Sequence, residues 1–285
     1  MEENQVLLEC RGIYKSFGKN KVLQDINLRV RKGEVHALLG QNGAGKSTLV
    51  KIITGVYSMN AGEIFMDGEP VRINSPKDSE NAGISIIHQD QQLVPFFDVT
   101  RNAFLGSEIR GKGGKLNFKK MKELVDEKLK LIESDFTSDQ QISSLSVGQR
   151  EQVAIVTALL QNPKLLILDE PTASLSSREI EKLFEVIGKL KKEGVTVIYI
   201  SHHLDEIFRI TDSITVLRDS RMQGTFSTES ISRKDVVSLM IGKELKDFYP
   251  KEEAVIGDTV LEVEDVYSGT LVKGASFKLR RGEIL

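Results

Sequence analysis

The chain has no tryptophan, a single cysteine and no apolar run long enough to cross a bilayer. The lone cysteine, Cys10, excludes an internal disulfide framework and suits a reducing cytoplasm. A membrane-spanning helix needs roughly 18 or more apolar residues in succession, so we expect any membrane role to come through a partner. Residues 1–5 lack the basic and apolar regions that are typical of a signal peptide.

A large charge imbalance is also missing. Lysine and arginine total 39 against 41 for aspartate and glutamate, which gives a net charge of -2 and no support for general nucleic-acid binding. The Lys-rich stretch 112–130 includes Glu123, Asp126 and Glu127, so it reads better as a solvated helix face than as a nucleic-acid patch. With 285 residues and 40% hydrophobic content, one large domain or two smaller ones are both open.

The most informative segment that is present is GQNGAGKS at 40–47, which fits the phosphate-cradling P-loop pattern. An apolar run, 35–39, precedes it and predicts a strand, whereas 48–53 predicts the start of a helix. Backbone N–H groups and the positive helix end would meet a polyphosphate, Lys46 would reach its β- and γ-phosphates, and the Ser47 hydroxyl would ligate Mg²⁺. The expected nucleotide contacts are Gly40, Gln41, Asn42, Gly43, Ala44, Gly45, Lys46, Ser47 and Thr48.

An internal repeat is the second strong signal. Residues 8–14 resemble 261–267, and 27–35 resemble 276–284, so the end of the chain looks like the start of a second copy. Leu285 aligns with His36, which places the last residue before any second P-loop. We therefore predict a tandem protein with a first domain at 1–244, a polar linker at 245–259 and a truncated second domain at 260–285.

Strand and helix signals alternate between these ends, which predicts an α/β fold with a largely parallel sheet. The runs 164–168 and 195–200 are typical of strands buried on both faces. Between them lies a helical pattern, with Ser176 and Glu179 spaced as a capping box and Gly194 placed as a C-terminal cap. Residues from about 95 to 160 carry helical patterns without clear strands and read as a helical insert.

The segment LSVGQ at 145–149 precedes LLILDE at 165–170, and together with the P-loop this order resembles the ATP-binding cassette (ABC) ATPases. The resemblance covers essentially the whole chain. It implies a P-loop NTPase core with a β-rich N-terminal subdomain and a helical insert. It also implies that ATP is the nucleotide and that Mg²⁺ accompanies it.

The pair Asp169-Glu170 fits catalysis in such a site. Four apolar residues place Asp169 at the end of a buried strand, where its carboxylate can hold Mg²⁺. Glu170 follows directly, so it points elsewhere and could act as general base toward water. The resemblance adds His202, after Ser201, as the switch histidine that contacts the γ-phosphate. His203 is the rival residue.

The resemblance implies two further contacts outside the P-loop. Phe17 matches the aromatic residue that stacks on adenine, although Tyr14 is close to it in sequence. Gln89 matches the glutamine that touches Mg²⁺ and the transmembrane partner. Gln91 and Gln92 compete with it more weakly, because they lack the matching context upstream.

The signature raises the question of partners. Ser146, Gly148 and Gln149 open the helix expected over 151–156, and in the family that positive end caps the γ-phosphate bound to the opposite cassette. Hydrolysis would then need two cassettes, so a single copy should bind ATP well and hydrolyse it slowly. Val147 stands where the common form of the signature has glycine. In the loop after Pro171, Ser176 stands where aspartate is usual, which leaves open how this loop contacts the other cassette.

The departures and the tandem layout look most like the cassette proteins of bacterial monosaccharide importers, for sugars such as ribose, galactose or xylose. That resemblance implies a peripheral protein on the cytoplasmic face of the membrane. Its partners would be permease subunits, a periplasmic or extracellular sugar-binding protein acting indirectly, and a second cassette or a second copy. Alternatives are a nucleoside importer ATPase and a soluble tandem ABC protein acting on the ribosome or DNA. A P-loop kinase is disfavoured by the signature, and a GTPase by the missing Asn-Lys-x-Asp motif.

Overall fold

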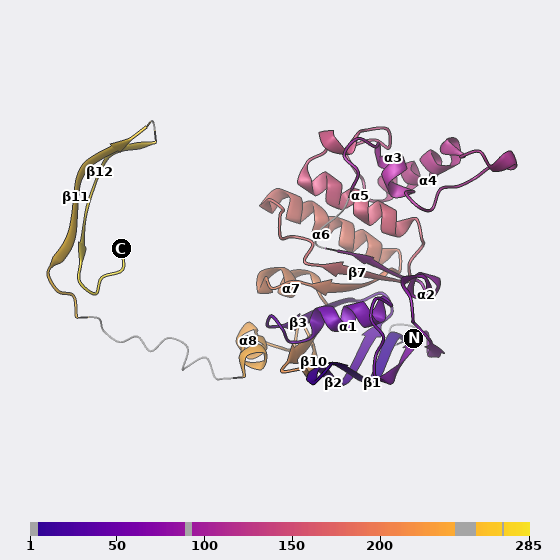
Figure 1. The fold of residues 1–285 in the computed structure, drawn as a ribbon, viewed down its shortest axis with the longest axis horizontal. Coiled ribbons are helices and arrows are strands. Elements are labelled where there is room, and N and C mark those ends of the chain that lie inside the picture. Colours follow the sequence, from indigo (N-terminus) through magenta and orange to yellow (C-terminus); the bar gives the residue numbers. More distant parts are fainter. Residues whose placement is uncertain (1–4, 89–92, 243–254, 270) are drawn as a thin grey trace. The chain divides into compact units, whose positions relative to one another are not determined.

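The computed structural model describes residues 5–88, 93–242, 255–269 and 271–285. Its backbone contacts divide the chain into two units, Met1–Lys243 and Glu244–Leu285, which are described separately below. Figure 1 shows both units and labels many of their elements.

The first unit is built on two sheets. An antiparallel sheet has the order β2-β1-β4-β5 and consists of β1 (Val6–Phe17), β2 (Asn20–Arg31), β4 (Ala61–Met66) and β5 (Glu69–Val71). The second sheet has six strands in the order β10-β9-β3-β8-β7-β6. It comprises β3 (Val35–Gly40), β6 (Ile84–Ile87), β7 (Leu165–Asp169), β8 (Thr196–Ile200) and β9 (Ser213–Arg218), all parallel, with β10 (Arg221–Ser227) antiparallel at one edge.

The six-stranded sheet is buried on both faces, because successive side chains in its strands alternate between two cores. On β3, Leu38 joins the core shared with the antiparallel sheet and with α1 (Lys46–Ile53). Leu39 joins the core on the opposite face, as does Leu166 of β7, whereas Leu165 turns toward α1. The expected strands at 35–39, 164–168 and 195–200 and the helix over 48–53 are confirmed within one or two residues.

The expected helical insert is also confirmed. It contains α3 (Val99–Ala103), α4 (Phe118–Leu131) and α5 (Val147–Leu159), with single 3₁₀ turns at Lys112–Gly114 and Ile142–Ser144. Apolar residues of all three helices join the core on the face of the six-stranded sheet opposite α1. In Figure 1 these helices lie at one end of the first unit and the antiparallel sheet lies at the other.

The remaining helices are α2 (Pro76–Asn81), α6 (Ser177–Lys192), α7 (Leu204–Ile210) and α8 (Arg233–Ile241). The capping box predicted for α6 is present, since the Glu179 carboxylate accepts a hydrogen bond from the Ser176 N–H at 3.0 Å. Gly194 lies just after the end of α6 with φ of +84°, a left-handed conformation that glycine adopts without strain. The sequence signals at both ends of this helix are therefore confirmed.

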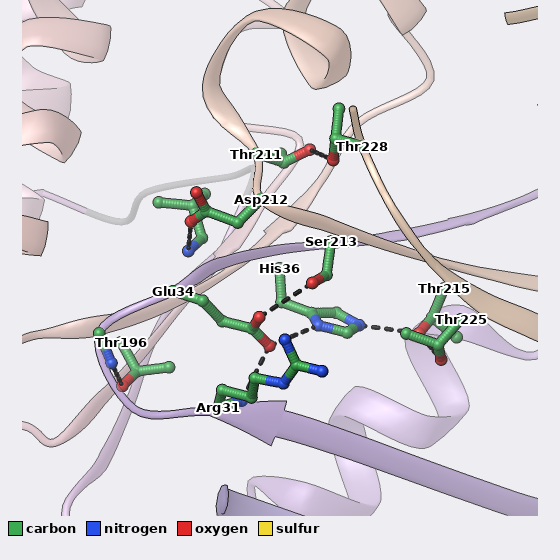
Figure 2. Close-up of polar contacts among 12 residues, drawn as sticks. Arg31, Glu34, His36, Thr196, Thr211, Asp212, Ser213, Thr215, Thr225 and Thr228 are labelled. Carbon is green, nitrogen blue, oxygen red and sulfur yellow. Dashed lines mark hydrogen bonds and ion pairs between the residues drawn. The ribbon is translucent and has the colours of Figure 1, made fainter. Parts of the chain in front are cut away.

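A buried polar network fixes the start of β3 (Figure 2). His36 is fully buried and its two ring nitrogens contact Glu34 at 2.9 Å and Thr215 at 2.7 Å. Glu34 also accepts from Ser213 at 2.9 Å, and Asp212 accepts from the backbone N–H of Val35 at 2.8 Å. Burying polar groups costs free energy unless they are paired. This network therefore fixes the register of β3 against β9 at the amino ends of the two strands, whereas the P-loop follows the carboxyl end of β3.

The second unit is an antiparallel hairpin of β11 (Thr259–Ser268) and β12 (Val272–Arg280) that repeats the β1–β2 hairpin. Glu9 pairs with Arg29 across β1 and β2 and forms an ion pair with it. Glu262 and Lys278 occupy the corresponding positions of β11 and β12 and also form an ion pair.

The irregular part of the hairpin is repeated as well. In β1, the N–H of Gly12 donates to the Asn27 side chain at 2.8 Å, and the φ of Gly12 is +55°. In β11, the N–H of Asp265 donates to the Ser276 hydroxyl at 2.9 Å, and the φ of Asp265 is +45°. The similarity seen in the sequence therefore extends to register, ion pair and bulge.

Candidate active site

The P-loop joins the carboxyl end of β3 to the first turn of α1. Its backbone bends through left-handed conformations at Gly43, with φ of +81°, and at Gly45, with φ of +110°. A Cβ at Gly45 would lie 2.6 Å from Leu23 Cδ2 and 2.9 Å from the carbonyl oxygen of Val22. The loop thus packs directly on β2, and only glycine fits at its last bend.

Lys46 opens α1 and folds back over the loop. Its ammonium donates to the carbonyl oxygens of Gly40 at 2.7 Å and Gln41 at 3.2 Å. Burial lowers the pKa of Lys46, and the carboxylates of Glu170 and Asp169 act in the opposite direction. A half-buried cation next to two carboxylates and a helix N-terminus is suited to hold a polyphosphate.

Two carboxylates enter the same region from β7, next to β8 in the sheet. Burial, and then the neighbouring charge of Glu170, raise the pKa of Asp169. Such a like-charged pair is stabilised by a cation, and the oxygen donors of Asp169 and Ser47 suit Mg²⁺. Within the described residues no group of three or more His, Cys, Asp or Glu side chains could hold a metal ion.

Glu170 itself has an unusual backbone. Its φ is +53°, a left-handed conformation that costs about 1–3 kcal/mol for a residue other than glycine. Its N–H donates to the carbonyl oxygen of Ile200 at 2.9 Å, which ties the residue to the end of β8. This turn sends the Glu170 side chain away from the direction that a regular strand would give it.

His202 follows β8, and its Nδ1 lies 2.8 Å from Oε2 of Glu170. The His203 ring lies against the His202 ring with centroids 4.0 Å apart, but no hydrogen bond or ion pair joins His203 to Glu170 in the part of the chain that the structure describes. Of the two candidate histidines, His202 is therefore the one that the fold brings to the carboxylate. The P-loop, Glu170 and His202 all follow the carboxyl ends of neighbouring parallel strands, where open α/β sheets bind ligands.

The aromatic residue proposed for adenine, Phe17, ends β1 and is 45% exposed. Its ring packs edge-on against Tyr57 at 5.3 Å, and the Lys15 ammonium lies 5.0 Å from its centroid. Tyr14 is similarly exposed, but the structure gives it no such aromatic partner among the described residues. Gln89 and its rivals at 91 and 92 lie outside the described residues.

The signature residues begin α5. Ser146 is the N-cap and forms a capping box with Gln149, whose side chain accepts from the Ser146 N–H at 2.9 Å. The Ser146 hydroxyl and the Gly148 N–H donate to one carboxylate oxygen of Glu179, at 3.0 and 2.9 Å. An internal carboxylate therefore occupies the anion position at this helix start, and no described hydrogen bond joins these three residues to Lys46 or to the catalytic carboxylates.

A cleft of about 430 Å³ is lined both by Glu170 and by the first turn of α5, which carries the signature residues. Glu170 lines one side of it, and Val147 and Arg150 from the first turn of α5 line another. A second cleft of about 570 Å³ is lined by residues of α2, β6, α3 and α5 and by His88, the residue directly before Gln89 in the sequence.

Sequence reasoning missed three features of this region: the left-handed turn at Glu170, the bonds from Glu179 to α5, and the buried carboxylate of Glu206. The last accepts hydrogen bonds from three hydroxyls, one after β7 and two at the end of β8. A glutamate four residues after His202 is visible in the sequence, but without the fold it looks like any helix residue.

Comparison with known proteins comes from three directions. The family described as ABC transporter matches residues 23–173. Proteins named ribose import ATP-binding protein RbsA are similar over 278 residues, with 42% identity in Bacillus subtilis strain 168 and 44% in Lactococcus lactis subsp. lactis strain IL1403. Both alignments cover 98% of this chain and 56% of the relative, so the chain spans little more than half the length of these relatives.

Two solved structures share the fold of the first unit. The ADP conformation of MJ1267, an ATP-binding cassette of an ABC transporter, has a TM-score of 0.74 at 26% identity and covers 84% of this chain and all of its own. The cbiO1 protein of Clostridium perfringens, part of the transporter complex cbiONQ, has a TM-score of 0.71 at 28% identity over 86% of this chain and 98% of its own.

Proposed function

Because this chain belongs to the ABC transporter family of ATP-binding cassettes, we propose that it is the ATP-binding and ATP-hydrolysing part of a monosaccharide importer. The observation that carries the proposal is the 2.8 Å contact between Glu170 and His202. This contact lies at the carboxyl ends of the parallel strands, as does the P-loop. A carboxylate paired with an imidazole beside a phosphate cradle supports water activation next to a γ-phosphate.

In this proposal Lys46 and the P-loop amides hold the β- and γ-phosphates, and Phe17 stacks on the adenine. The Glu170 carboxylate accepts a proton from the attacking water, and His202 orients that carboxylate through its contact with Oε2. Ser47 and Asp169, with Gln89, would hold Mg²⁺, which offsets the negative charge of the phosphates. The raised pKa of Asp169 supports this assignment, because burial and then the charge of Glu170 disfavour its charged form, and a bound cation would offset both.

We further propose that residues 260–285 begin a second cassette, joined to a first cassette at 1–244 by a linker at 245–259. The matched register, ion pair and bulge of the two hairpins support this. The exposure of equivalent leucines also supports a second cassette. Leu8 is fully buried in the first unit, whereas Leu261 at the equivalent position of the second hairpin is 46% exposed. Such a face is typical of a hairpin whose core is supplied by further chain.

For transport, the partner in this proposal is a membrane permease, served by a sugar-binding protein. No described helix of the chain is long and apolar enough to span a membrane, and the 570 Å³ cleft beside His88 is a surface on which a permease segment could dock. The protein would then lie at the cytoplasmic face of the membrane. Ribose is the first substrate to test, because the similar proteins named above are ribose import proteins.

The experiment is a comparison of MgATP binding and turnover in wild type and in Glu170→Gln. The variant keeps the size of the side chain and loses its proton-accepting charge, so it should retain MgATP through gel filtration while phosphate release falls by about 100-fold or more. Glu185→Gln, an exposed residue of α6, is the matched control. Normal turnover by Glu170→Gln would refute the assignment of the base.

A further inference from the structure

Glu206 lies on α7, outside the residues assigned to nucleotide chemistry, and is only 8% exposed. One of its carboxylate oxygens, Oε2, accepts three hydrogen bonds. The hydroxyl of Tyr199 donates at 2.8 Å, that of Thr172 at 3.0 Å and that of Ser201 at 3.0 Å. All three donor residues are buried, at 0%, 4% and 2% exposure.

The donors come from the segments that carry the proposed chemistry. Thr172 is two residues after Glu170, and Ser201 directly precedes His202. Tyr199 lies within β8, the strand between the P-loop strand and β7. The Ser201 hydroxyl also accepts the backbone N–H of His203 at 3.0 Å, so the same cluster fixes the turn that follows His202.

These hydrogen bonds join the two segments that must lie side by side for Glu170 to contact His202. Glu170 is in a left-handed backbone conformation, which persists only where the surroundings enforce it. His202 is on an exposed turn, with 65% of its side chain accessible. The two residues meet only if the segment after β7 and the segment after β8 are held in one relative position, and Glu206 is bonded to both.

We propose that Glu206 is a positioning residue that holds Glu170 and His202 together by bonding Thr172 and Ser201 at once. It acts through the segments on either side of the Glu170–His202 contact, to which its carboxylate is hydrogen-bonded. A carboxylate oxygen suits this task, because hydrogen bonds to a carboxylate are about twice as strong as those between neutral groups.

The inference rests on the proposed ATP hydrolysis, and the test separates the two. In Glu206→Gln the three hydroxyls meet a neutral oxygen, so we expect kcat to fall by about 10-fold with little change in ATP affinity. Thr172→Val, which removes one donor, should lower kcat, and Thr172→Ser, which restores the hydroxyl, should recover it. Asp205→Asn, an exposed neighbour on α7, is the matched control and should leave kcat unchanged.

A double-mutant cycle with His202→Ala distinguishes positioning from general damage to the fold. If Glu206 acts through His202, then adding Glu206→Gln to His202→Ala should lower kcat by less than about 3-fold further. A full multiplicative loss, or wild-type kcat in Glu206→Gln, would overturn the proposal.

A second readout does not depend on turnover. The Glu170 amide, which is bonded to Ile200, should exchange its hydrogen faster in Glu206→Gln while amides in β3 keep their protection. Unchanged exchange at Glu170 would also count against the inference. If wild type neither binds nor hydrolyses MgATP, the proposed function fails, and the exchange experiment alone decides whether Glu206 positions this turn.

Discussion

Replacing Gly45 with alanine tests whether β2 fixes the shape of the P-loop. The new methyl would lie 2.6 Å from Leu23 Cδ2 and 2.9 Å from the Val22 carbonyl oxygen, on a residue with φ of +110°. Gly43, two residues earlier, offers a matched control. Its φ is +81°, but a Cβ there would have no atom within 4 Å among the described residues beyond its chain neighbours. Both variants therefore strain the backbone, and only Gly45→Ala collides with the neighbouring strand.

The magnitude follows from that difference. A left-handed conformation costs about 1–2 kcal/mol for a residue with a Cβ, and this applies to both variants. Overpacking against a backbone carbonyl adds about 1–3 kcal/mol in Gly45→Ala alone. If the loop relaxes away from β2, its amides leave the phosphate position, and the extra loss corresponds to about a 5- to 150-fold weaker affinity for MgATP.

The assay is titration of each variant with a fluorescent ATP analogue in the presence of Mg²⁺, together with thermal unfolding. Gly45→Ala should bind much more weakly than Gly43→Ala, and its melting temperature should be lower by about 2–4 °C for each kcal/mol of additional strain that the fold retains. Equal affinities and equal melting temperatures in the two variants would refute the argument that packing against β2 shapes the loop.

Three further outcomes follow from other parts of the chain. Glu179→Gln removes the internal charge from the start of α5. If that helix start receives a phosphate from a second cassette, the chain concentration that gives half-maximal ATP turnover should fall by about 3- to 10-fold. An unchanged or higher concentration would contradict this expectation. Hydrogen bonds from Arg11 and Arg29 lower the pKa of Glu9 to about 2, so its stabilising effect is full above pH 4.5 and is lost as pH falls toward 2. In urea unfolding, Glu9→Gln should cost about 1–2 kcal/mol at neutral pH, because the exposed arginines are screened by solvent, and the cost should shrink by pH 3. Cross-strand amides in β11 and β12 should be protected from hydrogen exchange, and rapid exchange throughout 260–285 would rule out the packed hairpin.

The sequence predicted well those parts of the site whose chemistry lies in contiguous residues. The P-loop and the Asp169-Glu170 pair can each be recognised together with the residues beside them, because an apolar run that predicts a buried strand directly precedes each motif. The capping box at the start of α6 could be read in the same way, because Ser176 and Glu179 are three residues apart. Assignment of the roles of these residues in nucleotide binding remains a prediction.

Contacts between distant segments were beyond the sequence. The Glu206 cluster joins hydroxyls that are up to 34 residues away in the chain, and serine, threonine and tyrosine are too common for such a cluster to be recognised by pattern. The bond from Glu179 to the Gly148 N–H spans 31 residues. The positive φ of Glu170 was hidden for a different reason: the turn is enforced by tertiary contacts, whereas the residue type alone disfavours it.

The central claim is that the P-loop, Glu170 and a signature from another cassette form one ATP-hydrolysing site. The most direct test measures the MgATP hydrolysis rate against the concentration of the chain, with Glu170→Gln as control. We predict a rate that rises more steeply than linearly with concentration and is abolished in the variant. A rate per chain that is independent of concentration, or one that Glu170→Gln leaves intact, would contradict the account.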